Sequence, residues 1–284
     1  MAAAATVLAN AMGLRLTDGL AYGVDAEAYH EKCLGMISKS ALDQIDRSPA
    51  HYRVWLDGAG LKETPALAFG RAFHCCILEP AVFAATYAVV PDFGDCRKTA
   101  NKEARNAWYA AHDGRTFIEE ETLAAIRGME VAVRKHPAAS RILLDGASEV
   151  TLRWTDEHTG LPCKSRADYY VKSKRLVADL KSTEDASPAA FVRSVANYRY
   201  HVQDALYRDG FRACGEPIDH FALIAVEKTA PHGVAVYTLD EEAVAKGYSL
   251  ARANIEMMSE CLTSDRWPAY SNGVETLSLP RWAA

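Results

Sequence analysis

The sequence predicts a mixed α/β fold, of the α+β kind, in which helices precede and cover a central mixed β-sheet. Three observations support this. Apolar residues recur at helical spacing between about residues 37 and 144, the alternation typical of strands begins at Ala147, and helical spacing returns after Ser187. The length of 284 residues suits one large domain.

The N-terminal half is expected to be helical, with capping residues and prolines marking where its helices begin and end. Ser38 or Ser40 is suited to cap the first helix, which Pro49 interrupts. Thr64 is suited to cap the second helix, which Pro80 ends. The expected elements in this half are helices at 37–56, 64–80, 101–113 and 119–136, a short helix after Pro137, and a loop at 89–100.

The C-terminal half combines strands and helices. Its first three strands are expected to form an antiparallel meander, because short alternating runs follow one another with turn residues between them. The expected elements are strands at 148–155, 163–171, 175–182, 220–228 and 233–239, and helices at 187–198, 199–214 and 240–262. We therefore predict an N-terminal segment at 1–35 that is partly mobile, a single domain at 36–265, and a C-terminal tail at 266–284.

Charged residues interrupt the second and third strands of the meander. If their turn is centred on Ser173-Lys174, one face of the pair is wholly apolar and Asp168 lies opposite Asp179 on the other. Arg166 then lies opposite Lys181 on that same face. Two carboxylates at this spacing need a proton or a cation between them. The alternative is a solvated outer face, and a turn shifted by one residue would also undo the pairing.

The carboxylate pair predicts a site for a hard divalent cation. Mg²⁺ prefers carboxylate oxygens and keeps several waters when it is bound. Lys181 lies two residues beyond Asp179 and therefore on the same face of the strand. There it can orient a metal-bound water or stabilise charge on a phosphate oxygen, which is the chemistry of phosphodiester hydrolysis.

The pattern Asp168…Asp179-Leu180-Lys181 resembles the signature of the PD-(D/E)xK nuclease superfamily, in which D/E-x-K follows an Asp after about ten residues. Three further segments resemble its RecE-like (exonuclease VIII) and RecB-type exonuclease branch. They are "GRAFH" with His74, "SEVTL" with Glu149, and "QDALY" with Gln203 and Tyr207. The motifs follow the order of that branch over roughly residues 35 to 230. Gly70, four residues before His74, suggests close packing of its helix.

This resemblance implies a restriction-endonuclease-like core and a role for each motif residue. The implied metal ligands are His74, Asp168, Asp179 and the backbone carbonyl of Leu180. The implied catalytic residues are Lys181, Asp179, Asp168, Glu149 and Gln203. The metal is expected to be Mg²⁺, with Mn²⁺ as a substitute, and no iron–sulfur cluster is expected because the cysteines lack the family's four-cysteine spacing. A core or surface histidine remains the alternative for His74, and a surface glutamate for Glu149.

The resemblance also implies contacts with DNA. Tyr207 belongs to a motif that lies near DNA in the resembling nucleases, although it also fits a core position. Ser38, Lys39 and Ser40 stand at a helix start, where free N–H groups bind a 5′-phosphate or the side chains simply cap the helix. Because the net charge of −5 gives no general basic field, local cations must hold the DNA. Lys164 and Arg166 are candidates, and further ones are Lys172, Lys174, Arg175, Arg193 and Arg199.

The implied activity is that of a Mg²⁺-dependent exodeoxyribonuclease, of phage or prophage type, that degrades linear double-stranded DNA from its ends in the 5′→3′ direction. The remaining 3′ single strand would serve recombination through a RecT-like annealing protein, and relatives suggest a ring of three or four copies. The alternatives are an endonuclease or single-strand-specific nuclease on the same core, and a non-catalytic module that binds DNA ends.

Cysteine usage and hydropathy favour the cytoplasm. Seven cysteines occur without a C-x-x-C pair, and we expect free thiols in a reducing compartment. No uncharged run approaches the roughly 20 residues that span a bilayer, and the first residues lack the pattern of a signal peptide. We therefore expect no membrane partner.

Overall fold

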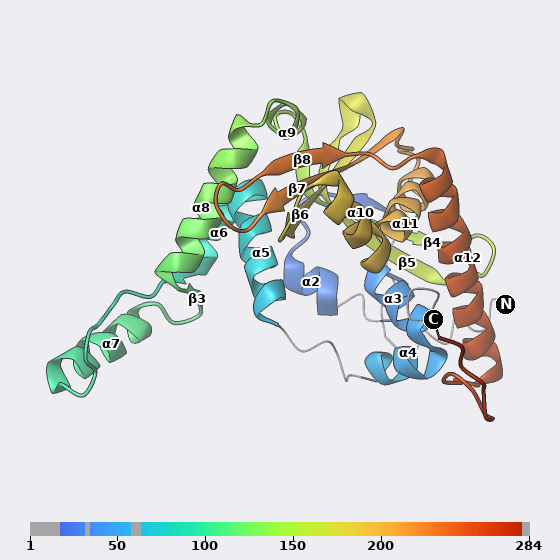
Figure 1. Cartoon of the computed structure of the whole chain (residues 1–284), viewed down its shortest axis with the longest axis horizontal. Coiled ribbons are helices and arrows are strands. Elements are labelled where there is room, and N and C mark those ends of the chain that lie inside the picture. Colours follow the sequence, from blue (N-terminus) through green and yellow to red (C-terminus); the bar gives the residue numbers. More distant parts are fainter. Residues whose placement is uncertain (1–17, 32–34, 58–63, 280–284) are drawn as a thin grey trace.

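The computed structural model describes residues 18–31, 35–57 and 64–279. Within this part of the chain the central sheet has six strands in the order β1–β4–β5–β6–β7–β8 (Figure 1). They are β1 (Gly19–Ala21), β4 (Ala147–Thr155), β5 (Pro162–Val171), β6 (Leu176–Thr183), β7 (His220–Glu227) and β8 (Val234–Tyr237). Neighbouring strands are antiparallel except β6 and β7, which are parallel. The predicted mixed sheet and its antiparallel meander are therefore confirmed.

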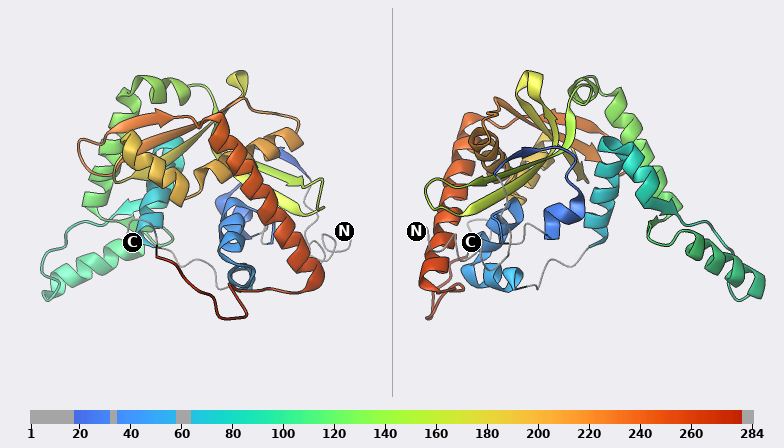
Figure 2. Two further views of the ribbon diagram at one scale, coloured as in Figure 1. Left: turned by 45° about the vertical axis from the view of Figure 1, so that its right-hand side comes forward. Right: turned by 180° about the vertical axis from the view of Figure 1, so that it is seen from behind.

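Helices cover both faces of this sheet (Figures 1 and 2). They are α2 (Ala26–Glu31), α3 (Lys39–Arg47), α4 (Pro49–Leu56), α5 (Pro65–Leu78), α6 (Pro80–Thr86), α7 (Thr99–Ala111), α8 (Glu120–Lys135), α9 (Pro137–Ile142), α10 (Pro188–Asn197), α11 (Tyr200–Ala213) and α12 (Glu241–Ser264). On one face α5, α8 and α9 contact β6, β7 and β8. On the other face α11 contacts β4 and β5, and α12 packs against α11 and α3. None of the described helices is both long enough and apolar enough to cross a membrane.

The sheet separates two apolar cores. Tyr169, Val171 and Ala178 of the β5–β6 pair belong to the core beneath α5 and α8. Tyr170 and Val177 belong to the core beneath α11 and α12. All five side chains are buried. Both faces of the pair are therefore covered, and the alternative of a solvated outer face is wrong.

Caps and prolines set the helix boundaries largely as expected. The hydroxyls of Ser38 and Thr64 each accept a hydrogen bond from the amide three residues on, at 3.3 and 3.2 Å. Pro49 separates α3 from α4. Pro80 differs from the prediction, because α5 ends at Leu78 and Pro80 begins α6. A proline is tolerated in the first turn of a helix, where its missing N–H would have no partner.

The segments on either side of the predicted domain at 36–265 contact it. β1, which lies inside the predicted N-terminal segment, pairs with β4 and places Leu20 opposite Leu152. In the C-terminal tail the carbonyl of Pro268 accepts a hydrogen bond from the amide of Ala50 at 3.0 Å. β1 was not predicted, because three residues are too few to show an alternating pattern.

The chain between α6 and α8 leaves the body of the molecule. β2 (Tyr87–Val89) and β3 (Thr116–Ile118) form a small parallel sheet, and α7 projects beyond it (Figures 1 and 2). No residue of α7 is buried. The ring of Phe117 lies 5.4 Å from that of Trp108 and 4.8 Å from that of Tyr109, between centroids. This aromatic cluster, rather than the sheet core, holds the projecting segment together.

Two glycines in the helices differ in how tightly their surroundings pack. A Cβ atom at Gly247 of α12 would overlap the backbone carbonyl of His201 in α11, so only glycine allows the two helices to approach so closely. A Cβ atom at Gly70 of α5 would instead lie 4.0 Å from Ser182 Oγ, an ordinary contact distance. The close packing expected at Gly70 is therefore wrong.

Candidate active site

β5 and β6 pair with each other only beside their turn. A short 3-10 turn at Lys172–Lys174 connects them, and the predicted register is confirmed. The paired positions are Tyr169–Ala178, Tyr170–Val177 and Val171–Leu176. The ladder ends one pair before Asp168 and Asp179, so the direct pairing predicted for these two carboxylates is wrong, as is that of Arg166 with Lys181. The amide of Leu180 donates instead to Asp168 Oδ2 at 2.8 Å, so a bond from backbone to side chain takes the place of a backbone bond between the strands.

Asp168 lies between β6 and α5. Its Oδ2 atom accepts the Leu180 hydrogen bond and lies 3.3 Å from Nδ1 of His74. Burial and the negative charge of Asp179 raise the pKa of Asp168 to about 6, against the attraction of His74 and Lys181. The carboxylates of Asp168 and Asp179 therefore repel each other, as the sequence predicts, although β5 and β6 are no longer paired here.

Gln203 of α11 joins the two charged residues of the D-x-K motif. Its side-chain amide donates to Asp179 Oδ1 at 2.5 Å, and its side-chain oxygen accepts from Lys181 Nζ at 3.1 Å. Lys181 also forms an ion pair with Asp179 Oδ2, and Asp179 is only 1% exposed. Burial opposes the charge on Lys181, but the carboxylates of Asp179 and Asp168 outweigh it and raise the pKa of Lys181. Lys181 is therefore a cation at neutral pH.

Glu149 adds a third carboxylate from β4. It faces Asp168 in the β4–β5 register but does not pair with it, because its φ of 53° lies in the left-handed region. Its Oε2 atom lies 3.6 Å from Nε of Arg166. Burial and the charge of Asp168 raise the pKa of Glu149 to about 8, although Arg166 acts in the opposite direction. The charged form of Glu149 is therefore disfavoured at this site, as that of Asp168 is.

The donor chemistry of this group fits a hard divalent cation. Asp168, Asp179 and Glu149 supply carboxylate oxygens, the ligands that such cations prefer. Oδ2 of Asp179 is buried without a hydrogen bond, and its ion-pair partner among the described residues is Lys181. Within the described ranges, no three His, Cys, Asp or Glu side chains are already gathered as metal ligands. Here His74 and Lys181 contact the carboxylates directly, so a cation would replace contacts that these side chains now make.

The start of α3 lies near the active-site lysine. The ammonium of Lys39 donates to both carboxylate oxygens of Asp43, at 2.6 and 2.8 Å. Burial lowers the pKa of Lys39, and the charge of Lys181 lowers it further, whereas Asp43 raises it. Ser38 caps the helix, and Ser40 is exposed. A 5′-phosphate site at these residues stays a prediction.

Three other residues predicted to contact DNA make internal contacts. The ammonium of Lys164, which is 6% exposed, donates to the carbonyl of Tyr29 at 2.8 Å. Lys164 and Arg166 both lie over the Tyr29 ring, at 4.3 and 4.7 Å from its centroid. The buried Tyr207 donates its hydroxyl proton to the carbonyl of Arg166 at 2.6 Å. Their contacts with DNA stay predictions, as does the metal contact of the Leu180 carbonyl.

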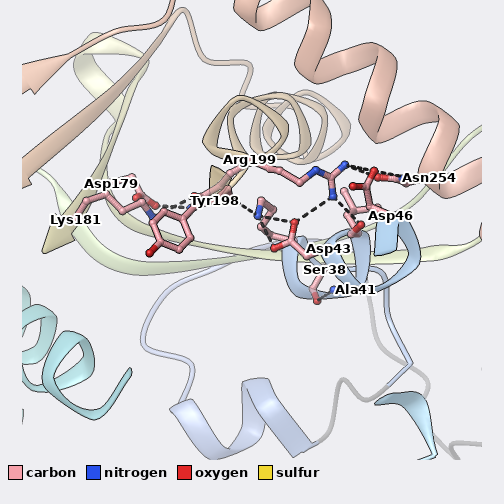
Figure 3. Close-up of polar contacts among 12 residues, drawn as sticks. Ser38, Ala41, Asp43, Asp46, Asp179, Lys181, Tyr198, Arg199 and Asn254 are labelled. Atoms are coloured by element: carbon pink, nitrogen blue, oxygen red, sulfur yellow. Dashed lines mark hydrogen bonds and ion pairs between the residues drawn. The ribbon is translucent and has the colours of Figure 1, made fainter. Parts of the chain in front are cut away.

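Two residues at the start of α11 also lie at the site. Sequence reasoning missed Tyr200 and named Arg199 only as a candidate DNA contact. The ring centroid of Tyr200 lies 4.5 Å from Lys181 Nζ. Arg199, in the left-handed conformation, joins α3, α11 and α12 behind the site (Figure 3). Its guanidinium contacts Asp43 at 3.1 Å, Asp46 at 3.0 Å and Asn254 at 2.6 Å. The signal in the sequence is their position just before the "QDALY" motif, and that position reveals neither contact.

Comparisons with known proteins found a matching family and similar solved structures. The family described as a PDDEXK-like domain of unknown function (DUF3799) matches residues 38–280. The crystal structure of a candidate exonuclease from Eubacterium rectale is similar with a TM-score of 0.60 and 13% identity, covering 92% of this chain and 97% of that one. At this identity the likeness concerns the fold alone.

A phage-related exonuclease from Haemophilus somnus is less similar. Its TM-score is 0.34 at 14% identity, covering 61% of this chain and 92% of that one. This value is too low to support a structural argument. No curated protein matches the sequence significantly.

Proposed function

The chain belongs to the family of PDDEXK-like domains (DUF3799), and on that premise we propose that it is a nuclease that hydrolyses phosphodiester bonds with a divalent cation. Its core is restriction-endonuclease-like. The observation that carries the proposal is the contact of Lys181, Asp179 and Gln203 at the point where β5 and β6 stop pairing, with Asp168 beside them. Mg²⁺ is the proposed cation, with Mn²⁺ as its substitute.

The carboxylates at this point would hold the cation. Asp168 and Asp179 are its proposed ligands, together with His74 and the Leu180 carbonyl, and Glu149 would complete the set through water. When bound, the cation would activate a water and offset charge on the phosphate. Because His74 and Lys181 now contact these carboxylates, both side chains would adjust when the cation binds.

Lys181 and Gln203 would act together on the reacting groups. The ammonium of Lys181 is held by Gln203 and carries a positive charge, so it can orient the attacking water or stabilise a phosphate oxygen. Gln203 would be a positioning residue, because its amide fixes the Asp179 carboxylate while its oxygen fixes the ammonium. Both contacts depend on α11 lying against the sheet.

We extend the proposal to the substrate. The resemblance of the motifs to RecE-like exonucleases supports digestion of linear double-stranded DNA from its ends, in the 5′→3′ direction. The same resemblance supports a 3′ single-stranded product, a RecT-like annealing protein as partner and a ring of three or four copies. Digestion of duplexes labelled at either end tests the direction, and light scattering of the purified protein tests the ring.

The decisive test is digestion of a 5′-labelled linear duplex with Mg²⁺, with EDTA, and with the Lys181→Ala variant. Lys135→Ala is the matched control, because Lys135 is an exposed lysine at the end of α8. We expect release of label by the wild type and the control with Mg²⁺, and none with EDTA or Lys181→Ala. Equal release by Lys181→Ala and wild type would disprove the role of Lys181.

Closed circular plasmid distinguishes the alternatives. An exonuclease spares the plasmid, whereas an endonuclease on the same core cuts it. If the wild type degraded neither linear nor circular DNA with Mg²⁺ or Mn²⁺ but still bound DNA ends, a non-catalytic binding module would replace the proposed nuclease.

A further inference from the structure

An aromatic stack leads from the solvent to the active-site lysine. Tyr198 follows α10 and Tyr200 begins α11, and their rings are stacked with centroids 5.7 Å apart and planes 22° apart. The Tyr200 centroid lies 4.5 Å from Lys181 Nζ, whereas Tyr198 is 63% exposed. Figure 3 shows Tyr198 between the pair Asp179–Lys181 and the charged cluster around Arg199. The outermost ring of the stack is therefore exposed beside the groups that would act on a phosphate.

This stack is supported from behind and from the side. The Tyr200 ring packs on the buried Phe191, with centroids 6.1 Å apart. Arg199, between the two tyrosines, has a φ of 54° and is bound through its guanidinium to α3 and α12. Lys39 donates to the carbonyl of Tyr198 at 3.0 Å. Tyr198 is thus an exposed aromatic residue on a backbone that α3 and α12 hold in place.

We propose that Tyr198 and Tyr200 form a stacking platform for one unpaired nucleobase, that of a nucleotide next to the scissile phosphate. This inference rests on the proposed nuclease function. A base on the outer face of Tyr198 continues the existing stack, and its backbone then lies toward the positive charges of Lys181 and Lys39. Because every base has a π-face, such a platform accepts any base and gives no sequence preference.

The platform also predicts which DNA ends the protein prefers. A base inside a duplex has both of its faces covered, so it must leave the stack before it can lie on Tyr198. The cost of unstacking is smallest for a mismatched or single-stranded base. Ends whose last nucleotides are unpaired are therefore preferred over fully paired ends.

Binding in EDTA tests the platform without hydrolysis. The probe is a linear duplex whose terminal nucleotides are unpaired and carry 2-aminopurine, placed in turn on each strand, with a fully paired duplex for comparison. Wild type, Tyr198→Ala, Tyr198→Phe and Tyr270→Ala are titrated by fluorescence. Tyr270 is the matched control, because it is 73% exposed and lies on the C-terminal tail beside His51.

We expect Tyr198→Ala to weaken binding of the unpaired end about 10-fold and to abolish the fluorescence change that stacking causes. Tyr198→Phe should bind the unpaired end as tightly as the wild type and give the same fluorescence change, because it retains the ring. Tyr270→Ala should match the wild type. On the fully paired duplex, Tyr198→Ala should change the affinity less than twofold, since unstacking limits use of the platform there.

Two results would overturn the platform. One is equal affinity of Tyr198→Ala and wild type for the unpaired end, and the other is the same loss on paired and unpaired ends. Digestion with Mg²⁺ separates this failure from that of the function. Equal digestion rates for Tyr198→Ala and wild type on unpaired ends remove the platform and leave the nuclease, whereas a wild type that digests no DNA removes the nuclease.

Discussion

Beside their turn, in the closed half of the pair, β5 and β6 form a regular antiparallel ladder, whereas from Asp168 and Asp179 onward, in the open half, their backbones are no longer paired. In the closed half Tyr170 pairs with Val177, and both side chains are buried among apolar groups. In the open half Asp168 and Asp179 occupy the next positions of the same register, yet the carboxylate of Asp168 takes a hydrogen bond from the backbone of β6. Both halves belong to the same two strands, β5 and β6.

The difference shows what charged pairs demand of a sheet. Like charges directly opposite each other destabilise strand pairing, because their Cβ atoms lie only about 4.5–5.5 Å apart. Opening the ladder allows each carboxylate to find a partner from a different face of the sheet. His74 of α5 contacts Asp168, and Gln203 of α11 contacts Asp179. The backbone bonds lost between β5 and β6 are thus exchanged for the contacts that form the site.

Among residues that position the charged groups without carrying charge themselves, Gln203 should have the largest effect. Gln203→Leu removes both hydrogen bonds that join Asp179 to Lys181, and we expect nuclease activity to fall about 10- to 100-fold, as when a residue that orients a metal ligand is lost. Tyr170→Phe, which removes one hydroxyl contact at the closed end, should stay within twofold of wild type. Turnover rates at saturating Mg²⁺ check this, and equal losses in both variants would contradict it.

The closed half should govern stability rather than chemistry. Val177 is fully buried, so Val177→Ala should lower the free energy of unfolding by about 2 kcal/mol. The activity of the protein that remains folded should be unchanged, because Val177 lies in the closed half and its apolar side chain can form no hydrogen bond or ion pair with the site. Urea unfolding followed by circular dichroism measures the first quantity, and specific activity at low temperature measures the second. Loss of specific activity in the folded variant would show that the two halves are coupled.

The negative charge of Asp168 in the open half should lower the free energy of unfolding of the protein. The pKa of Asp168 is raised to about 6, so its charged form is disfavoured in the fold at neutral pH. Asp168→Asn should therefore raise the free energy of unfolding in EDTA by about 1 kcal/mol while it abolishes activity.

The stability gained by Asp168→Asn should depend on pH. A carboxyl group whose pKa is higher in the folded state stabilises the fold as pH falls through that pKa. The advantage of Asp168→Asn should thus be fully present above pH 6 and should disappear near pH 4, as wild-type Asp168 takes up its proton. Unfolding in EDTA at a series of pH values checks this, and an advantage that grew toward low pH would contradict it.

The smallest effect is expected at Gly70, where α5 faces the open half of β6. Space exists for a Cβ atom, which would lie 4.0 Å from Ser182 Oγ. Gly70→Ala should therefore raise the free energy of unfolding by about 0.5–1 kcal/mol, since alanine favours the helix. Thermal unfolding measures this. A loss of stability would mean that α5 lies closer to β6 than the structure places it.

The motif residues and the register were predictable because both depend on local features. Alternation identified β5 and β6, and the turn at Lys172–Lys174 fixed which residues pair. The end of the ladder was not predictable, because counting along two strands assumes that pairing continues. The contact of Tyr200 with Lys181 depends on how α11 sits on β6, and no periodic pattern reports such an arrangement. The pairing of β1 with β4 joins distant parts of the chain and was equally hidden.

The close approach of α11 and α12 at Gly247 has a consequence for how this chain can evolve. Every other residue would bring a Cβ atom against the carbonyl of His201, which lies two positions before Gln203. A mutation at Gly247 therefore moves the backbone of α11 or is rejected, although the residue touches no group of the site. In a library of random variants screened for activity, Gly247 should tolerate as few substitutions as Lys181 does.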